Sequence, residues 1–227
     1  MNEDRVSGWA LVAGSAGVII TLVLHPSGRG LFDPSQFEAA ARILVAVHSI
    51  GLASLPVWFI GAYGLSRRLD DVAPEAAAPR LGLYGMILYG LALIAMMVAI
   101  TFDGLVTPGI ASRIVQTSGD QQAQMWKTIL RYNGFVDEAF VNLFIAGSSV
   151  AIALWSLKML RTRILSRGLG IAGVLLAVLT LGVQFSGLLA RFFHIFGMVL
   201  VVQAAWLTSA GVMLLKTRNY HQGASTQ

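Results

Sequence analysis

The sequence predicts an all-α integral membrane protein, in which six transmembrane helices form a bundle within a single domain, residues 1–227. Composition is the first observation behind this prediction. Hydrophobic residues make up 56% of the chain and charged residues 12%, against roughly 25% charged in a soluble domain. So few charges cannot coat a soluble surface, and lipid must cover the rest. The second observation is that the apolar residues form six runs, each close to the ~20 residues that a helix needs to cross a bilayer.

The first predicted span covers residues 8–24 and ends at His25 and Pro26. Its apolar run is longer than the core of a signal peptide, and no small-residue cleavage site follows it. We therefore expect a membrane helix here and not a leader that is removed.

The second predicted span, residues 45–66, belongs to a longer helical pattern that begins with Asp33 as N-cap. Its proline, Pro56, cannot donate a hydrogen bond to the carbonyl of Leu52, one turn from His48. We expect a kink at this point that opens a small space between helices.

The third predicted span, residues 81–100, ends at the polar stretch 101–104. From Pro108 to Asn133 the chain is hydrophilic, so we expect a long outer connection. Within it, residues 118–132 carry apolar side chains on one side of a helical projection, which predicts a short amphipathic helix between the third and fourth spans.

The remaining predicted spans cover residues 138–157, 168–188 and 193–215, and a polar, flexible cytoplasmic tail follows at 216–227. Polar residues in the fourth span recur at spacings of four and seven, which places them on one helix face. Such a stripe should face protein or water and not lipid. Its members are Glu138, Asn142, Ser149 and Ser156.

Charge distribution predicts the orientation of the bundle. Six spans put both termini on one side, and with both in the cytoplasm the inner segments carry more Lys and Arg than the outer ones, as the positive-inside rule requires. The net charge of +5 lies at the ends of the apolar runs, which is not the pattern of a nucleic-acid partner. Arginine outnumbers lysine, and alanine and glycine are abundant, which favours a GC-rich bacterium and thus a bacterial inner membrane.

Candidate chemistry gathers near the outer ends of the spans. With no cysteine in the chain, disulfides and thiolate metal sites are excluded. Depths counted at about 1.5 Å per residue place three histidines and three carboxylates near one outer plane: His25, His48, Asp103, Asp137, Glu138 and His194. Imidazole and carboxylate groups suit a divalent metal such as Zn, Fe, Mn or Cu, and a haem iron held by two histidines fits less well. The predicted ligands are His25, His48, Asp103, Glu138 and His194, and we expect Asn142 and Gln184 to line the same pocket.

Three functions are compatible with this pattern. The first is an outward-facing His/carboxylate pocket, in an enzyme or a binding protein, that holds a metal or a small lipophilic or periplasmic molecule. The second is a structural or accessory subunit, because polar residues are common at the ends of membrane helices and need not converge on a site. The third is a small-molecule transporter. Besides the lipid bilayer, a homo-oligomer or a larger membrane complex is an expected partner.

Overall fold

The computed structural model of the protein describes residues 3–26, 28–71, 80–187 and 193–216, without the side chains of Arg29, Phe193 and His194. Every described element is a helix. In chain order the elements are α1 (Glu3–Leu24), the 3₁₀ helix η1 (Gly28–Phe32), α2 (Phe37–Asp71), α3 (Leu81–Thr101), the π-helical turn η2 (Phe102–Val106), α4 (Thr107–Gln116), α5 (Asp120–Thr162), α6 (Arg167–Phe185) and α8 (Phe193–Lys216).

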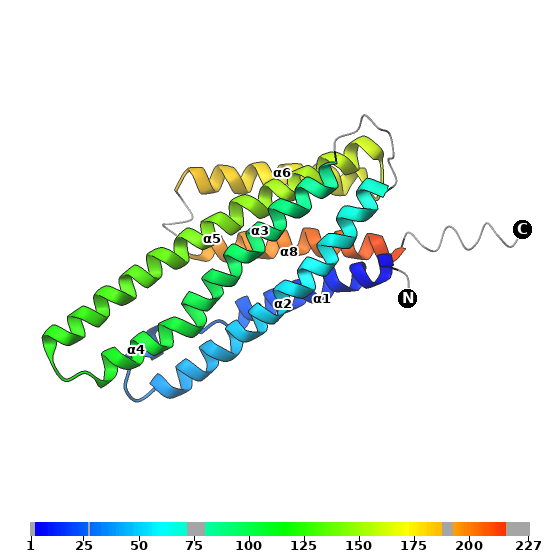
Figure 1. The fold of residues 1–227 in the computed structure, drawn as a ribbon. Coiled ribbons are helices and arrows are strands. Elements are labelled where there is room, and N and C mark those ends of the chain that lie inside the picture. The colour runs from blue at the N-terminus through cyan, green and yellow to red at the C-terminus, as the bar shows by residue number, and fades with distance from the viewer. Residues whose placement is uncertain (1–2, 27, 72–79, 188–192, 217–227) are drawn as a thin grey trace, which may run out of the picture.

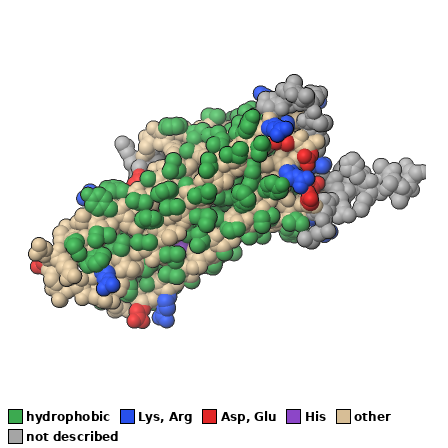
Figure 2. All heavy atoms as spheres, viewed as in Figure 1, with side chains coloured by type: hydrophobic (Ala, Val, Ile, Leu, Met, Phe, Trp, Pro, Cys, Tyr) green, Lys and Arg blue, Asp and Glu red, His purple; other side chains and the backbone are tan. Residues whose placement is uncertain are grey.

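Within the described residues, six helical stretches are long and apolar enough to cross a membrane, as judged by length and composition. Five of them are α1, α2, α5, α6 and α8, and the sixth is the continuous run formed by α3, η2 and α4. The predicted all-helical fold with six such helices is therefore confirmed. Figure 2 shows that hydrophobic side chains cover the middle of one face, whereas charged side chains gather toward its ends.

The six long helices form a closed ring in which each packs against two neighbours. The order around the ring is α1, α2, α3, α5, α6, α8 and back to α1. The start of α1 and the end of α8 lie at the same end of the bundle (Figure 1). The opposite end, where α1 finishes and His25 follows, is called the histidine end below.

A layer of aromatic rings fills the centre of the ring of helices. Trp58 of α2, Tyr89 of α3, Trp155 of α5 and Trp206 of α8 are all buried. Neighbouring rings in this series have centroids 6.3, 5.3 and 6.3 Å apart. The three indole N–H groups donate to the Ser15 hydroxyl, the Gly82 carbonyl and the Leu169 carbonyl, respectively. Each buried indole nitrogen thus has a partner on an adjacent helix.

Each tryptophan of this layer lies directly on a glycine of a neighbouring helix. Trp58 contacts Gly14 of α1, Trp155 contacts Gly85 of α3, and Trp206 contacts Gly173 of α6. Glycine lets two helices approach closely. A Cβ at any of these three glycines would collide with the tryptophan that rests on it, so the Trp–Gly contacts help to determine which helix faces pair.

The structure corrects the predicted outer connection. The helix that begins as α3 does not end at residues 101–104, because η2 and α4 continue it to Gln116. Pro108 lies in the first turn of α4, directly after the π-helical turn η2. Residues 118–132 do not form a separate amphipathic helix either, since α5 runs unbroken from Asp120.

The histidine end therefore extends as a helical projection. The 43 residues of α5 span about 65 Å at 1.5 Å per residue, twice the ~30 Å hydrocarbon core of a bilayer. Figure 1 shows α2, α4 and α5 reaching past the ends of α1, α6 and α8 on this side. A small apolar cluster of Leu31, Leu44 and Ala111 joins η1, α2 and α4 there.

We expect Gly85→Ala to destabilise the protein by about 1–3 kcal/mol, the usual cost of overpacking. A Cβ at this position would lie 2.5 Å from Nε1 of Trp155, and the hydrogen bond to Gly82 holds that indole in place. Thermal unfolding in detergent, followed by circular dichroism, measures the effect. The matched control is Gly182→Ala in α6, where a Cβ would meet nothing within 4 Å. Equal stability of the two variants would contradict the packing argument.

Candidate metal centre

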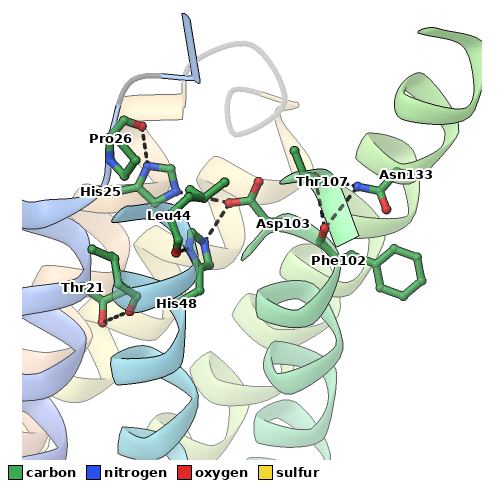
Figure 3. A network of polar contacts seen from close by, with 10 residues as sticks. Thr21, His25, Pro26, Leu44, His48, Phe102, Asp103, Thr107 and Asn133 are labelled. Carbon is green, nitrogen blue, oxygen red and sulfur yellow. Dashed lines mark hydrogen bonds and ion pairs between the residues drawn. The ribbon is translucent and has the colours of Figure 1, made fainter. Parts of the chain in front are cut away.

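Three titratable side chains from three different elements converge at the histidine end. His25 follows α1, His48 belongs to α2 and Asp103 belongs to η2. One carboxylate oxygen of Asp103, Oδ2, lies 2.9 Å from Nε2 of His48 and 3.2 Å from Nε2 of His25 (Figure 3). Candidate ligand atoms of all three residues lie within 4.8 Å of one another. The structure thus brings together three of the five residues that the sequence suggested as metal ligands.

Backbone carbonyls orient both imidazole rings. Nδ1 of His48 lies 2.8 Å from the carbonyl oxygen of Leu44, one turn earlier in α2, and Nδ1 of His25 lies 3.0 Å from that of Pro26. A carbonyl oxygen only accepts hydrogen bonds, so each Nδ1 must carry a proton. In the neutral rings the lone pair is then on Nε2, and both lone pairs are directed at the Asp103 carboxylate.

This arrangement requires positive charge between the three side chains. Protonation of a ring can supply it: the hydrogen bond to Asp103 raises the pKa of His25, which lies just beyond the end of α1, although burial of the ring opposes the shift. A divalent cation bound between the three side chains would also supply positive charge at this place. Ligand atoms about 2.0–2.1 Å from a metal lie roughly 2.8–3.0 Å apart in octahedral geometry and roughly 3.3–3.4 Å apart in tetrahedral geometry. The two N–O distances, 2.9 and 3.2 Å, fall between these limits.

The same geometry disfavours a haem. A haem iron held by two histidines needs the rings on opposite faces of a porphyrin. Here the Oδ2 atom of Asp103 contacts both Nε2 atoms, so the carboxylate occupies the space through which the porphyrin plane would pass.

A π-helical turn carries Asp103. In η2 the N–H of Thr107 donates to the carbonyl of Phe102, five residues earlier. The Thr107 hydroxyl donates to the same carbonyl at 3.1 Å. Nδ2 of Asn133, from α5, donates to the Phe102 carbonyl and to the Thr107 hydroxyl at 3.2 and 2.9 Å (Figure 3). Asn133 thereby holds the turn that places Asp103, and such turns occur frequently at functional sites.

Gly104 sets the distance between η2 and α2. A Cβ added at this position would collide with the His48 side chain. Only a residue without a side chain allows the two helices to approach this closely, which brings the Asp103 carboxylate within hydrogen-bond distance of His48.

A cavity of about 300 Å³ extends from the cluster into the bundle, between α1, α2, α3, α5 and α8. Four further polar side chains line it: Thr21 of α1, and Asp137, Glu138 and Asn142 of α5. The deeper lining is apolar, and Trp58 of the aromatic layer belongs to it. The cluster is therefore open to a space that is polar at one end and apolar at the other.

The other predicted site residues have different positions. Glu138 and Asn142 line the cavity. Gln184 of α6 is not among its lining residues, because its side-chain amide donates instead to the Asn142 carbonyl, at 2.9 Å. His194 is the second residue of α8, and its side chain lies outside the described part of the structure.

Asp137 was not predicted as a site residue, although it lines the same cavity. It precedes Glu138 in the chain, and neighbouring positions of a helix point about 100° apart. A choice between them requires knowing which side of α5 faces α1 and α2, and the sequence pattern does not contain that information.

Comparison with known proteins identifies no relative. No protein-family model matches the chain, and neither the search of curated proteins nor that of solved structures found a match.

We expect Asn133→Ala to lower the stability by about 1 kcal/mol, the typical value of a buried hydrogen bond, because two hydrogen bonds to η2 are lost. Thr128→Ala on the same helix is the control. Its hydroxyl is exposed and bonds only to the Gln124 carbonyl of its own helix, so this change should stay within ±0.5 kcal/mol. Thermal unfolding in detergent compares the two, and an equal loss would show that Asn133 does not hold the turn.

Proposed function

We propose that the chain is an integral membrane protein that binds one divalent transition-metal ion through His25, His48 and Asp103. The observation that carries this proposal is the convergence of two Nε2 atoms on one carboxylate oxygen, at 3.2 and 2.9 Å. Metal-ligating histidines almost always donate their other ring N–H to a carbonyl, carboxylate or water, and the contacts to Leu44 and Pro26 supply that feature. Two imidazoles and a carboxylate suit Zn, Fe, Mn or Cu.

An open coordination position supports an enzyme or a binding protein. Three protein ligands leave at least one position for water or a substrate, and the cavity beside the cluster gives such a molecule room. Asp137 and Glu138 line the same cavity. Either carboxylate is a candidate general base for a metal-bound water, or a further ligand to the metal.

The proposed setting is a bacterial inner membrane, with the histidine end outside and both termini in the cytoplasm. Basic residues at the other end support this orientation under the positive-inside rule. At that end Arg67 pairs with Glu3 and Lys158 with Asp70, and Arg161 lies in the last turn of α5.

Single cysteines at Asp120 and Arg163 test this setting. The two positions flank α5, and the chain has no cysteine of its own. A membrane-impermeant thiol reagent added to intact cells should label Asp120→Cys, whereas Arg163→Cys should react only after the membrane is permeabilised. Labelling of both variants, or of neither, in intact cells would contradict a spanning α5 with this orientation.

Metal binding is tested with detergent-purified protein that has been stripped by a chelator and titrated with Co²⁺. We expect about one ion per chain, with visible absorption bands that report nitrogen and oxygen ligands. Asp103→Asn removes the ligand oxygen's charge and should weaken binding at least about 100-fold, more than the 10–100-fold typical of outer-shell changes. Asp120→Asn, an exposed residue at the start of α5, is the matched control and should bind as the wild type does. Absence of stoichiometric binding, or equal loss in both variants, would overturn the proposal.

A further inference from the structure

We propose that the cavity beside the metal binds a small amphiphile with an uncharged oxygen head group, an alcohol or a carbonyl, and a short hydrocarbon tail. The head group would lie at the open metal position and the tail between the helices. This inference rests on the proposed metal site and adds the chemical class of its ligand.

The order of lining residues along each helix gives the cavity its direction. In α2, His48 is followed toward the basic end by Gly51, Leu55 and Trp58. In α1 and α5 the same direction leads from His25 past Thr21 and Leu22 to Val18, and from Asp137 and Glu138 past Val141 and Asn142 to Ile145. Three helices thus repeat one gradient, polar or mixed in the first turn from the histidine end and apolar about two turns deeper. A ligand that is polar at one end and apolar at the other matches it.

The aromatic layer limits the length of the tail. Trp58 lies ten residues beyond His48 in α2, about 15 Å at 1.5 Å per residue. Its indole rests on Gly14 and donates to the Ser15 hydroxyl, so it cannot easily move aside. A cavity of about 300 Å³ is also at the small end of the ~300–1,000 Å³ range of ligand pockets. A short tail fits this space, whereas a full-length phospholipid chain does not.

Charge at the polar end selects the head group. A divalent ion brings two positive charges, and ionised Asp103, Asp137 and Glu138 bring three negative ones. No lysine or arginine of the described chain lines the cavity. The net charge of the pocket is therefore negative when all three carboxyls are ionised and zero when one is protonated, so it never attracts an anionic head group and repels one in the fully ionised state. A hydroxyl or carbonyl oxygen can bind the metal without placing another negative charge beside the carboxylates.

Two probes with equal tails, 1-octanol and octanoate, test the head-group preference. Each is titrated into the Co²⁺-loaded full-length protein in detergent, with its concentration expressed as mole fraction in the micelle. We expect 1-octanol to change the visible Co²⁺ spectrum by replacing a metal-bound water. Octanoate should produce the same change only at a mole fraction at least about tenfold higher. Equal or stronger binding of octanoate, or no response to 1-octanol, would overturn the inference.

A cavity-filling variant tests where the tail lies. Val18→Phe places a ring in the deep part of the cavity, away from the metal ligands. It should weaken the binding of 1-octanol about tenfold, which corresponds to the loss of burial of roughly two methylene groups of the tail. Val178→Phe makes the same change on an exposed position of α6 and should have no effect. If Val18→Phe does not fold, Leu22→Trp, one turn away on the same lining face, replaces it. An unchanged response in the cavity variant would contradict the proposed tail position.

Co²⁺ binding, measured first for every protein, separates the two proposals. If the wild type binds no Co²⁺, the metal site itself is wrong and the ligand inference fails with it. A second outcome is that the wild type and Val18→Phe both bind one Co²⁺, but the response to 1-octanol is absent or is the same in the two proteins. In that case the metal site stands and only the ligand inference is overturned.

Discussion

The contact between tryptophan rings and bare glycine backbone is the constraint on which the arrangement of this bundle depends. The six long helices are apolar over much of their length, so apolar character alone does not distinguish one helix pair from another, and close packing and buried hydrogen bonds must select the partners. Trp58, Trp155 and Trp206 satisfy both needs, because each indole rests on a glycine and donates to a neighbouring helix. This layer closes the centre of the ring, and the cavity begins where the layer ends.

The candidate site depends on an irregular turn that is held from outside. A π-helical turn has poorer backbone geometry than an α-helix and is usually short. In η2 the Phe102 carbonyl accepts three hydrogen bonds, two of which come from side chains. Asn133 is 7% exposed, and both of its donated bonds go to this turn. The bundle thus stabilises, through a helix that carries no ligand, the segment that positions Asp103.

The sequence predicted the features that depend on distance along one helix, namely the helix lengths and the depths of the site residues. It did not predict the features that depend on which helices and helix faces lie side by side. The six helices follow from the length of the apolar runs, and the depths of His25, His48 and Asp103 follow from the helical rise. Gln184 was assigned to the pocket although no described residue of α6 lines it. Asp137 was placed near the outer plane but was not chosen as a site residue, although it lines the cavity. The predicted outer loop failed for another reason: residues 107–132 belong mostly to the helical projection, and a polar helix that is not packed inside the bundle resembles a loop in composition.

The position of the cluster at a helix end keeps its charged groups close to water and still anchors the site to the core of the bundle. A carboxylate and two imidazoles in the middle of the bundle would incur the full cost of burying charge. At the histidine end Asp103 keeps 39% of its side chain exposed, whereas His48 keeps only 5%, so water can stabilise the charge while one ring anchors the site to the core. In the proposed metal site, an open coordination position would face water on one side and the cavity on the other. The proposed ligand would then keep its tail among the apolar residues of the cavity while its oxygen reaches the ion.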